Sequence, residues 1–387
     1  MDSRLLYLAL GSFAGNVEGA LIVVVLPAIA AETGVSIAQA GLLVFCYSIA
    51  YGFGTPLLSS LFGGVDRRTV VVGGEFAFGV AALLMGLLPG LLLLLVVRTF
   101  LACGAGMFTS TAQATAVAIA APGKRGKAMA TVMLGATIGV AAGVPLAALV
   151  ANLYGWRVAY VGIGMLGIAA AITLRLRLPD NLHGDTKTLM QRLSVVRIKG
   201  VPMMLLASGL MSVSGFMLMT YLAPVATGEM GLKQDAMPVV MLVFGIGALL
   251  GNFIIGWLAD RIGPRRTVLL AISATICLLL GLPLVGELPL ELRRPVFFGC
   301  VALFGMLTWG AFPAQLLRLA NIAHSSMPLA ASLNLTAGNL GVAAAAVLGG
   351  FAFEQAGLYG IGWGGAAVAV LALIVSVAVP EKLQEQG

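Results

Sequence analysis

Twelve long apolar runs, separated by short polar segments, constrain this chain more than any other feature. Each run can cross about 30 Å of hydrocarbon at a helical rise of about 1.5 Å per residue. The chain is 60% hydrophobic and 10% charged, whereas roughly a quarter of the residues in soluble domains are charged. The runs lack the alternating polarity of a β-barrel strand. The sequence predicts an all-α membrane protein with spans near 5–31, 37–62, 69–89, 91–119, 128–151, 158–175, 201–226, 236–259, 267–285, 295–317, 327–353 and 360–379.

The basic residues gather on one side of these spans. With the N-terminus in the cytoplasm, 17 of the 22 Lys and Arg residues fall on the cytoplasmic side and four on the other. Cytoplasmic loops carry this excess, so we expect both termini in the cytoplasm of a cell that holds the chain in its inner membrane. The basic residues form no single soluble face, so we expect no nucleic-acid partner. The seventeen are Arg4, Arg67, Arg68, Lys124, Arg125, Lys127, Arg175, Arg177, Lys187, Arg192, Arg197, Lys199, Arg261, Arg265, Arg266, Arg318 and Lys382.

The two halves of the chain are related in sequence. Arg67-Arg68-Thr69-Val70 follows the second span of the first half, and Arg265-Arg266-Thr267-Val268 follows the second span of the second half, 198 residues later. Internal repeats of this kind are common in secondary transporters. We therefore predict a six-helix bundle over 1–178, a cytoplasmic hinge loop over 179–199 and a second six-helix bundle over 200–387.

The strongest motif lies between the eighth and ninth spans and reads Gly-Trp-Leu-Ala-Asp-Arg-Ile-Gly-Pro-Arg-Arg. It resembles the G-x-L-A-D-R-x-G-x-R-R loop of the major facilitator superfamily. Its glycines allow a tight turn, its aspartate can pair with a basic residue or a helix N-terminus, and its arginines can anchor at the anionic inner leaflet. The motif residues are Gly256, Asp260, Arg261, Gly263, Arg265 and Arg266.

The first half departs from this pattern. Phe62 stands where Asp260 stands in the second half, and Asp66 comes four residues later. The resemblance implies that the first-half aspartate locks the two bundles together in one state. Here that lock is either missing or made differently by Asp66.

Span five carries a glycine at every fourth position, followed by a proline, at Gly135, Gly139, Gly143 and Pro145. Such a bare stripe lets a neighbouring helix approach closely, and the proline bends the span. Generic small-residue packing would explain it without a function. The pattern nevertheless resembles the signature of the superfamily's exporters and antiporters, although Val144 separates the usual Gly-Pro pair.

Three charged residues lie inside spans, namely Glu18, Glu75 and Arg98. Burying a charge in a membrane is costly and suggests a function. Glu18 lies roughly 20 Å from the inner surface and Arg98 roughly 10 Å from the outer surface, by the helical rise. In a core of about 30 Å these depths coincide, so the two side chains can face each other. Glu75 lies nearer the end of span three, where we expect it to snorkel or to pair with loop arginines.

The resemblance adds a role for this pair. In the superfamily, helices one and four line the central cavity, and Gly15-Asn16-Val17-Glu18 resembles the acidic first helix of drug- and sugar-efflux members. Removal from water favours a protonated carboxyl, and a nearby Arg favours the ionised form. Glu18 and Arg98 are therefore the predicted proton-coupling residues, with a static structural ion pair as the alternative.

Polar residues elsewhere in the spans are the candidates for substrate binding, although each could instead hydrogen-bond a neighbouring helix. The chain has no catalytic motif, no metal-ligand spacing and no sign of a cofactor. Gly162-Ile163-Gly164-Met165-Leu166-Gly167 matches a dinucleotide motif but has no strand before it. The substrate candidates are Asn16, Tyr47, Gln113, Ser214, Trp309, Gln315 and Asn334.

Together these features predict a monomeric secondary transporter of the major facilitator fold that is not an enzyme. We expect twelve helices in two pseudo-symmetric bundles, surrounded by lipid and working by alternating access. The favoured activity is export of a small organic molecule, such as a drug, sugar or nucleoside-like metabolite, in exchange for protons. A proton-coupled importer or facilitator is the first alternative. A non-transporting membrane sensor is less favoured, because a soluble domain or long tail would be expected.

The basic asymmetry gives a direct topological prediction. A reporter fused after Gly387 that is active only in the periplasm should stay silent, because both termini are predicted to be cytoplasmic. Enzyme activity from colonies carrying the fusion is the measurement. A matched fusion after Leu88, in the predicted loop between spans three and four, should be active. The reverse pattern would contradict the topology.

Overall fold

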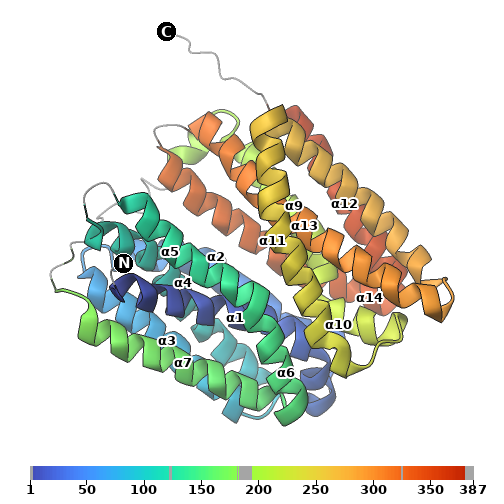
Figure 1. Cartoon of the computed structure of the whole chain (residues 1–387), viewed down its shortest axis with the longest axis horizontal. Helices are drawn as coiled ribbons and strands as arrows, with labels where there is room; N and C mark the ends of the chain where they lie inside the picture. Colours follow the sequence, from blue (N-terminus) through green and yellow to red (C-terminus); the bar gives the residue numbers. More distant parts are fainter. Residues whose placement is uncertain (1–2, 122–123, 181, 183–193, 324–325, 380–387) are drawn as a thin grey trace, which may run out of the picture. The chain divides into compact units, whose positions relative to one another are not determined.

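The computed structural model describes residues 3–121, 124–180, 182, 194–323 and 326–379. Within them the chain is helical with short connections and forms two compact units (Figure 1). One unit contains residues 1–36 and 46–188, and the other contains 37–45 and 189–387. Most of the predicted hinge, 181 and 183–193, lies outside the described residues.

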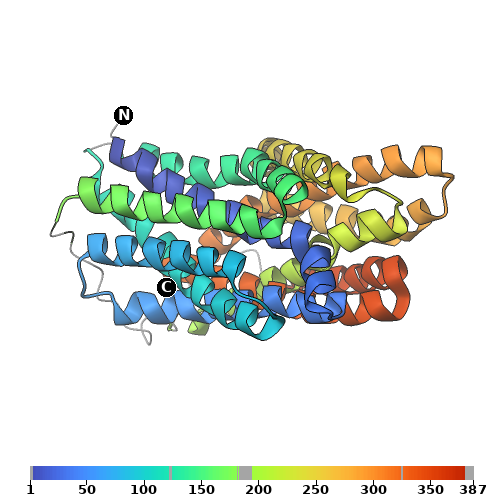
Figure 2. The ribbon, with the colours of Figure 1, turned by 90° about the horizontal axis from the view of Figure 1, so that it is seen from below.

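The helices of the first unit follow the predicted spans. Each is long and apolar enough to cross a membrane when α5, a short π-helical turn and α6 are counted as one span. Figure 2 shows α7, in green, beside α1 in dark blue and α3 in light blue. The elements are α1 (Ser3–Thr33), α2 (Ile37–Leu61), α3 (Arg67–Leu87), α4 (Leu91–Ile119), α5 (Arg125–Ile138), η1 (Gly139–Gly143), α6 (Val144–Tyr154) and α7 (Trp156–Arg177).

The second unit continues the pattern, with one very long helix at its end. α14 spans 52 residues but is interrupted at Ala356 and Gly357, where Gly357 has a φ of 52°. It therefore supplies two spans, and the eleven apolar segments correspond to the twelve predicted. The elements are η2 (Ser194–Arg197), α9 (Val201–Thr220), α10 (Leu222–Pro224), η3 (Val225–Glu229), η4 (Gln234–Ala236), α11 (Met237–Ile262), α12 (Pro264–Gly286), α13 (Leu290–Ala323) and α14 (Met327–Ala378).

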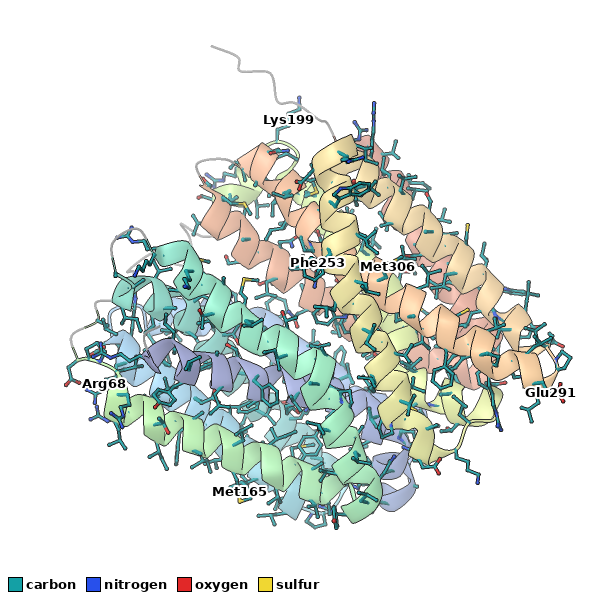
Figure 3. The ribbon with its side chains drawn as sticks, in the orientation of Figure 1. Arg68, Met165, Lys199, Phe253, Glu291 and Met306 are labelled. Atoms are coloured by element: carbon teal, nitrogen blue, oxygen red, sulfur yellow. The ribbon has the colours of Figure 1, made fainter. Side chains whose placement is uncertain are left out.

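Glycines allow the helices to pack closely within each unit. In the first, a methyl group at Gly79 of α3 would lie 2.7 Å from the backbone nitrogen of Ile168 on α7. In the second, α11 crosses α13 so closely that Gly251 has no room for a side chain against Met306 (Figure 3). Helices in lipid gain little from the hydrophobic effect, so close backbone approach is a main source of their association.

The glycine stripe of span five makes the close helix contact that the spacing predicted, and its partner is α1. Gly135 lies on the backbone of Ala9, and Gly143 lies against Phe13 and Val17. A methyl group at Gly139 would lie 2.9 Å from the Phe13 carbonyl oxygen. Because the three contacts on α1 are four residues apart, they fix both the distance and the rotation of α1 relative to α5.

The same span contains a widened helical turn that the sequence did not predict. Gly139–Gly143 is π-helical, and the Val144 N–H donates to the Gly139 carbonyl oxygen. Pro145 has no N–H for the usual bond to the residue four positions earlier. The wide turn therefore sits where the proline interrupts the α-helical hydrogen-bond ladder.

The second unit repeats this packing. Gly341 of α14 stands 198 residues after Gly143. It lies so close to the Gly209 carbonyl oxygen of α9 that a side chain at position 341 would not fit. Gly209 in turn stands 198 residues after Gly11 of α1. A close contact between the first and fifth spans thus recurs in the second half, although Gly143 meets Phe13 and Val17 whereas Gly341 meets Gly209 and Ser212. This recurrence supports two pseudo-symmetric bundles.

The α1–α5 contact predicts opposite effects for two Gly→Ala substitutions. Gly135→Ala should destabilise the protein by about 1–3 kcal/mol, because the methyl group meets rigid backbone. Gly162→Ala on α7 has no atom within 4 Å and should be neutral or stabilising by up to about 1 kcal/mol. Thermal unfolding in detergent measures both. Equal stability of the two variants would contradict the contact.

Candidate functional site

The α1–α5 contact determines where Glu18 points. Val17 packs on Gly143 of η1, which continues α5, and the next side chain on a helix points about 100° away. Glu18 therefore turns away from α5 and into the first unit. Its side chain is 0% exposed, so it does not face lipid.

Glu18 forms a salt bridge with Arg98 of α4. The bond joins Oε1 of Glu18 to Nη1 of Arg98, and the Arg98 side chain is 1% exposed. The structure thus brings together the two charges whose predicted depths coincide. A lone buried charge would be very costly, and each member of the pair compensates the other.

Two tyrosines hold the Arg98 guanidinium in place. Nη1 of Arg98 donates to the Tyr160 hydroxyl of α7 at 3.3 Å. The ring of Tyr47 on α2 lies under the guanidinium, 4.6 Å from its carbon to the ring centroid, and stacks on Tyr51. A cation over an aromatic face is attracted by the ring quadrupole, more strongly when desolvated.

The pair is not fully hydrogen-bonded. Glu18 Oε2 and Arg98 Nε are buried and have no hydrogen-bond partner within the described residues. An unsatisfied buried polar atom costs about 1–3 kcal/mol, and such atoms mark places where a ligand or proton can bind. One helical turn away, the side-chain position at Gly15 has no atom within 4 Å.

One arginine of the repeated motif contacts the end of the last helix in each unit, although Arg68 corresponds in the repeat to Arg266 and not to Arg265. Arg68 bonds the Arg175 carbonyl oxygen in the last turn of α7 and pairs with Asp180. Figure 3 places Arg68 at that end of the unit. Arg265 donates to the Val377 carbonyl oxygen, near the end of α14, at 2.7 Å. The last carbonyls of a helix lack backbone partners and carry partial negative charge, so each arginine caps a helix.

The sequence profile of the Major Facilitator Superfamily matches residues 8–327. The chain belongs to the major facilitator superfamily. It is a multi-pass membrane transporter and not an enzyme, as the motif and the helix count predicted.

Named relatives in the superfamily match along almost their whole length. The uncharacterized MFS-type transporter YbcL of Bacillus subtilis (strain 168) is 29% identical over 97% of this chain and 95% of its own length. The inner membrane transport protein YdhP of Escherichia coli (strain K12) is 28% identical over 96% and 94%. A chloramphenicol resistance protein of Streptomyces lividans is 27% identical over 90% and 89%.

A solved structure shares the fold. A bacterial homolog of the human lysosomal transporter Spinster, in an inward-facing and unoccupied conformation, superposes with a TM-score of 0.74. The match covers 97% of this chain and 95% of that chain at 17% identity. At this identity the likeness establishes the major facilitator fold alone.

Among the predicted substrate residues, only Tyr47 contacts the ion pair through a described interaction. Asn16 uses its amide to donate to the Ser12 carbonyl oxygen at 2.8 Å. Gln315 donates to Ser208 and accepts from Arg318 in a buried network, which is the helix-bonding role that was its alternative. The remaining candidates differ in exposure: Gln113 is half-buried, Trp309 exposed, and Ser214 and Asn334 buried.

The expectation for Glu75 was wrong. It neither snorkels to the surface nor pairs with an arginine in the described part of the chain, since its side chain is 1% exposed and its Oε1 has no hydrogen-bond partner there. Its carboxyl carbon lies beside Gly11 of α1 and near Phe108 of α4. The sequence placed span three at the periphery, but the face that carries Glu75 turns inward.

Three other expectations need correction. Arg318, counted with the loop residues, lies buried in α13 and donates to the Ser376 carbonyl oxygen at 2.9 Å. Gly256 is inside α11 with open space beside it, so Gly263, with a φ of 87°, is the motif glycine that makes the turn. Asp260 is exposed and has no ion pair among the described residues.

Asp66 has a local role in the structure. It accepts from the Arg68 N–H at 2.9 Å and caps the start of α3. An aspartate is a preferred residue at this position because its carboxylate satisfies a free N–H of the first turn. Whether Asp66 also replaces the missing first-half lock stays a prediction.

Sequence reasoning missed the cluster at the other end of α1. Glu32 accepts from Trp156 Nε1 at 2.8 Å and pairs with Arg157. Arg157 also donates to the Leu88 carbonyl oxygen at 2.9 Å, so α1, α3 and α7 are joined there. The spacing of the chain gave no sign that Glu32 is the partner of Trp156 and Arg157.

The buried ion pair predicts a non-additive stability pattern. Arg98→Met alone should destabilise the protein by about 3–5 kcal/mol, because Glu18 remains buried without its cation. Adding Glu18→Gln should restore much of that loss. Thermal unfolding in detergent gives the comparison, with exposed Arg177→Met as a control expected to change stability by about 0.5 kcal/mol or less. Additive losses in the double variant would contradict the pair.

Proposed function

We propose that this transporter exports a small organic molecule in exchange for protons, with Glu18 as the proton carrier and Arg98 as the group that tunes it. The observation that carries the proposal is the buried salt bridge between α1 and α4. A carboxylate in a low-dielectric site is either protonated or paired with a cation. Glu18 can alternate between these two states, and while it is protonated the Arg98 cation keeps only its contacts with Tyr160 and the ring of Tyr47.

The exchange follows from this alternation. When Glu18 takes a proton, its attraction to Arg98 weakens. Arg98 then still donates a hydrogen bond to Tyr160 and still lies over the ring of Tyr47. When a substrate binds and interacts with Arg98 or with the free Oε2 of Glu18, the balance between proton and cation changes again. Proton and substrate thus compete for one group, and this competition couples antiport in an alternating-access transporter.

Two further observations support export over import. The Gly135–Pro145 stripe resembles the signature of the superfamily's exporters, and it packs on the helix that carries Glu18. The Streptomyces lividans relative is named for chloramphenicol resistance, an outcome that export can produce. A hydrophobic site with one acid suits small lipophilic or cationic molecules.

We also propose that the protein lies in the cytoplasmic membrane with both termini inside. The 17-to-4 distribution of basic residues supports this orientation. The Escherichia coli relative is named an inner membrane transport protein.

The test is accumulation of a compound panel, with chloramphenicol as its first member, in a hypersusceptible strain with and without a protonophore. Wild type should lower the accumulation of at least one compound, and the protonophore should abolish the effect. Glu18→Gln keeps shape and hydrogen bonding but cannot titrate, so it should lose uphill export and keep downhill exchange.

The exposed Glu287→Gln is the matched control and should export like wild type, since within the described residues the Glu287 carboxylate accepts from the Tyr359 hydroxyl and lies outside the Glu18 site. Uphill, protonophore-sensitive export by Glu18→Gln at the wild-type rate would overturn the role of Glu18. Higher accumulation with the wild-type protein than without it would indicate import.

A further inference from the structure

A second carboxyl group is buried in the first unit at a place that the proposed exchange does not use. Glu75 lies in α3, and its side chain is 1% exposed. Its Oε1 has no hydrogen-bond partner within the described residues. A carboxyl group that is kept without a cation in an apolar interior is expensive, and in membrane proteins such groups mark proton pathways.

The position of Glu75 relates it to Glu18. A methyl group at Gly11 would meet the Phe108 ring first and would lie 3.0 Å from the carboxyl carbon of Glu75, so the glycine makes room for both the ring and the carboxyl. Gly11 precedes Glu18 by seven residues, which is two helical turns, or about 10 Å, on the same face of α1. Both carboxyl groups therefore lie along one face of one helix.

This face of α1 is open at Gly15, on the Glu18 side of the Phe108 ring. Gly15 lies between Gly11 and Glu18, and its side-chain position has no atom within 4 Å. The titratable groups in the interior spans around this face are Tyr7 on α1, Tyr47 and Tyr51 on α2, Arg98 and Cys103 on α4, and Tyr160 on α7. The charged groups at the helix ends are Arg4, Glu32, Arg67, Arg68, Arg125, Lys127, Arg157, Arg175 and Arg177. None forms a salt bridge with Glu75, and the Arg98 guanidinium is engaged by Glu18 and Tyr160.

We propose that Glu75 is a second protonation site, which exchanges the transported proton with Glu18 along the Gly11–Gly15 face of α1. This inference rests on the proposed function. The O–H bond of the Glu18 carboxyl breaks and an O–H bond forms on Glu75. Water in the space beside Gly15 accepts one proton and gives up another, so it is unchanged.

The charges balance in this step. Glu18 becomes a carboxylate that Arg98 neutralises, and Glu75 becomes a neutral acid in its apolar surroundings. Glu75 is ionised only briefly, after giving its previous proton to solvent. A buried apolar cluster that includes Leu8, Val71 and Phe108 lies between Glu75 and the N-terminal end of α1, so this release requires the cluster to open during alternating access. That end is cytoplasmic in the proposed topology, so the relay releases the proton on the inner side, as antiport requires.

The test follows protons without any substrate. The full-length protein in nanodiscs of phosphatidylethanolamine and phosphatidylglycerol is brought to acid pH and then jumped to alkaline pH. The infrared carbonyl band of protonated carboxylic acids reports the buried groups. Wild type should show two such groups, and Glu18→Gln and Glu75→Gln should each lose a different one.

The kinetics decide whether Glu75 is a relay or merely a neutral structural acid. In Glu75→Gln, the Glu18 band should decay about a hundredfold more slowly, the lower end of what a positioned acid–base group contributes. Glu75→Asp should recover part of the rate, and it serves as the test variant if Glu75→Gln does not fold. Glu287→Gln should leave both bands and both rates unchanged.

Decay of the Glu18 band at the wild-type rate in Glu75→Gln would overturn the relay, as would a Glu75 band that never titrates in the folded protein. These outcomes are separate from failure of the proposed function. If the protonophore has no effect on wild-type export, the coupling proposal falls whatever the infrared rates are. If export is protonophore-sensitive and the rates are equal, only the relay falls.

Discussion

The ion pair between Glu18 and Arg98 is possible only because several helices enclose it. A membrane interior offers no water to solvate a charge, so each of these groups must be compensated by protein. The glycine stripe at Gly135, Gly139 and Gly143 brings α5 onto α1 and sets the rotation that turns Glu18 inward. Tyr160 of α7 and Tyr47 of α2 complete the surroundings of Arg98. The burial of the ion pair therefore depends on the close backbone packing of α1 against span five.

The two halves share their packing but not their chemistry. The contact of Gly143 on α1 has its counterpart at Gly341 on α9, and both halves cap the end of their last helix with a motif arginine. The buried acids at Glu18 and Glu75 belong to the first half. In the second half, Arg318 is instead held by Gln315 and the Ser376 carbonyl oxygen. This asymmetry is consistent with one bundle carrying the proton chemistry in a duplicated fold.

Much of this could be predicted from the sequence, for definite physical reasons. Hydrophobic length gives the spans, and depth along a helix gives the level of Glu18 and Arg98, because the helical rise is constant. Spacing also showed that the span-five glycines form a contact. It could not show that α1 is the partner, because that depends on tertiary packing.

The predictions that were wrong also concern features that depend on tertiary packing. Glu75 was misplaced because the direction of a helix face depends on which neighbours it meets. Arg318 was assigned to a loop because α13 continues to Ala323, beyond the apolar run that marked its end. The widened turn before Pro145 depends on how the helix adjusts to a missing N–H, which hydropathy does not report.

The account depends most on the claim that substrate and proton compete at Glu18. The direct measurement is proton release from the purified protein in weakly buffered detergent, followed with a pH-indicator dye. The added substrate is a compound that wild type exports in a protonophore-sensitive manner. The account predicts that binding releases protons from wild type and none from Glu18→Gln, although the variant still binds the compound. Equal proton release from the two proteins would contradict it.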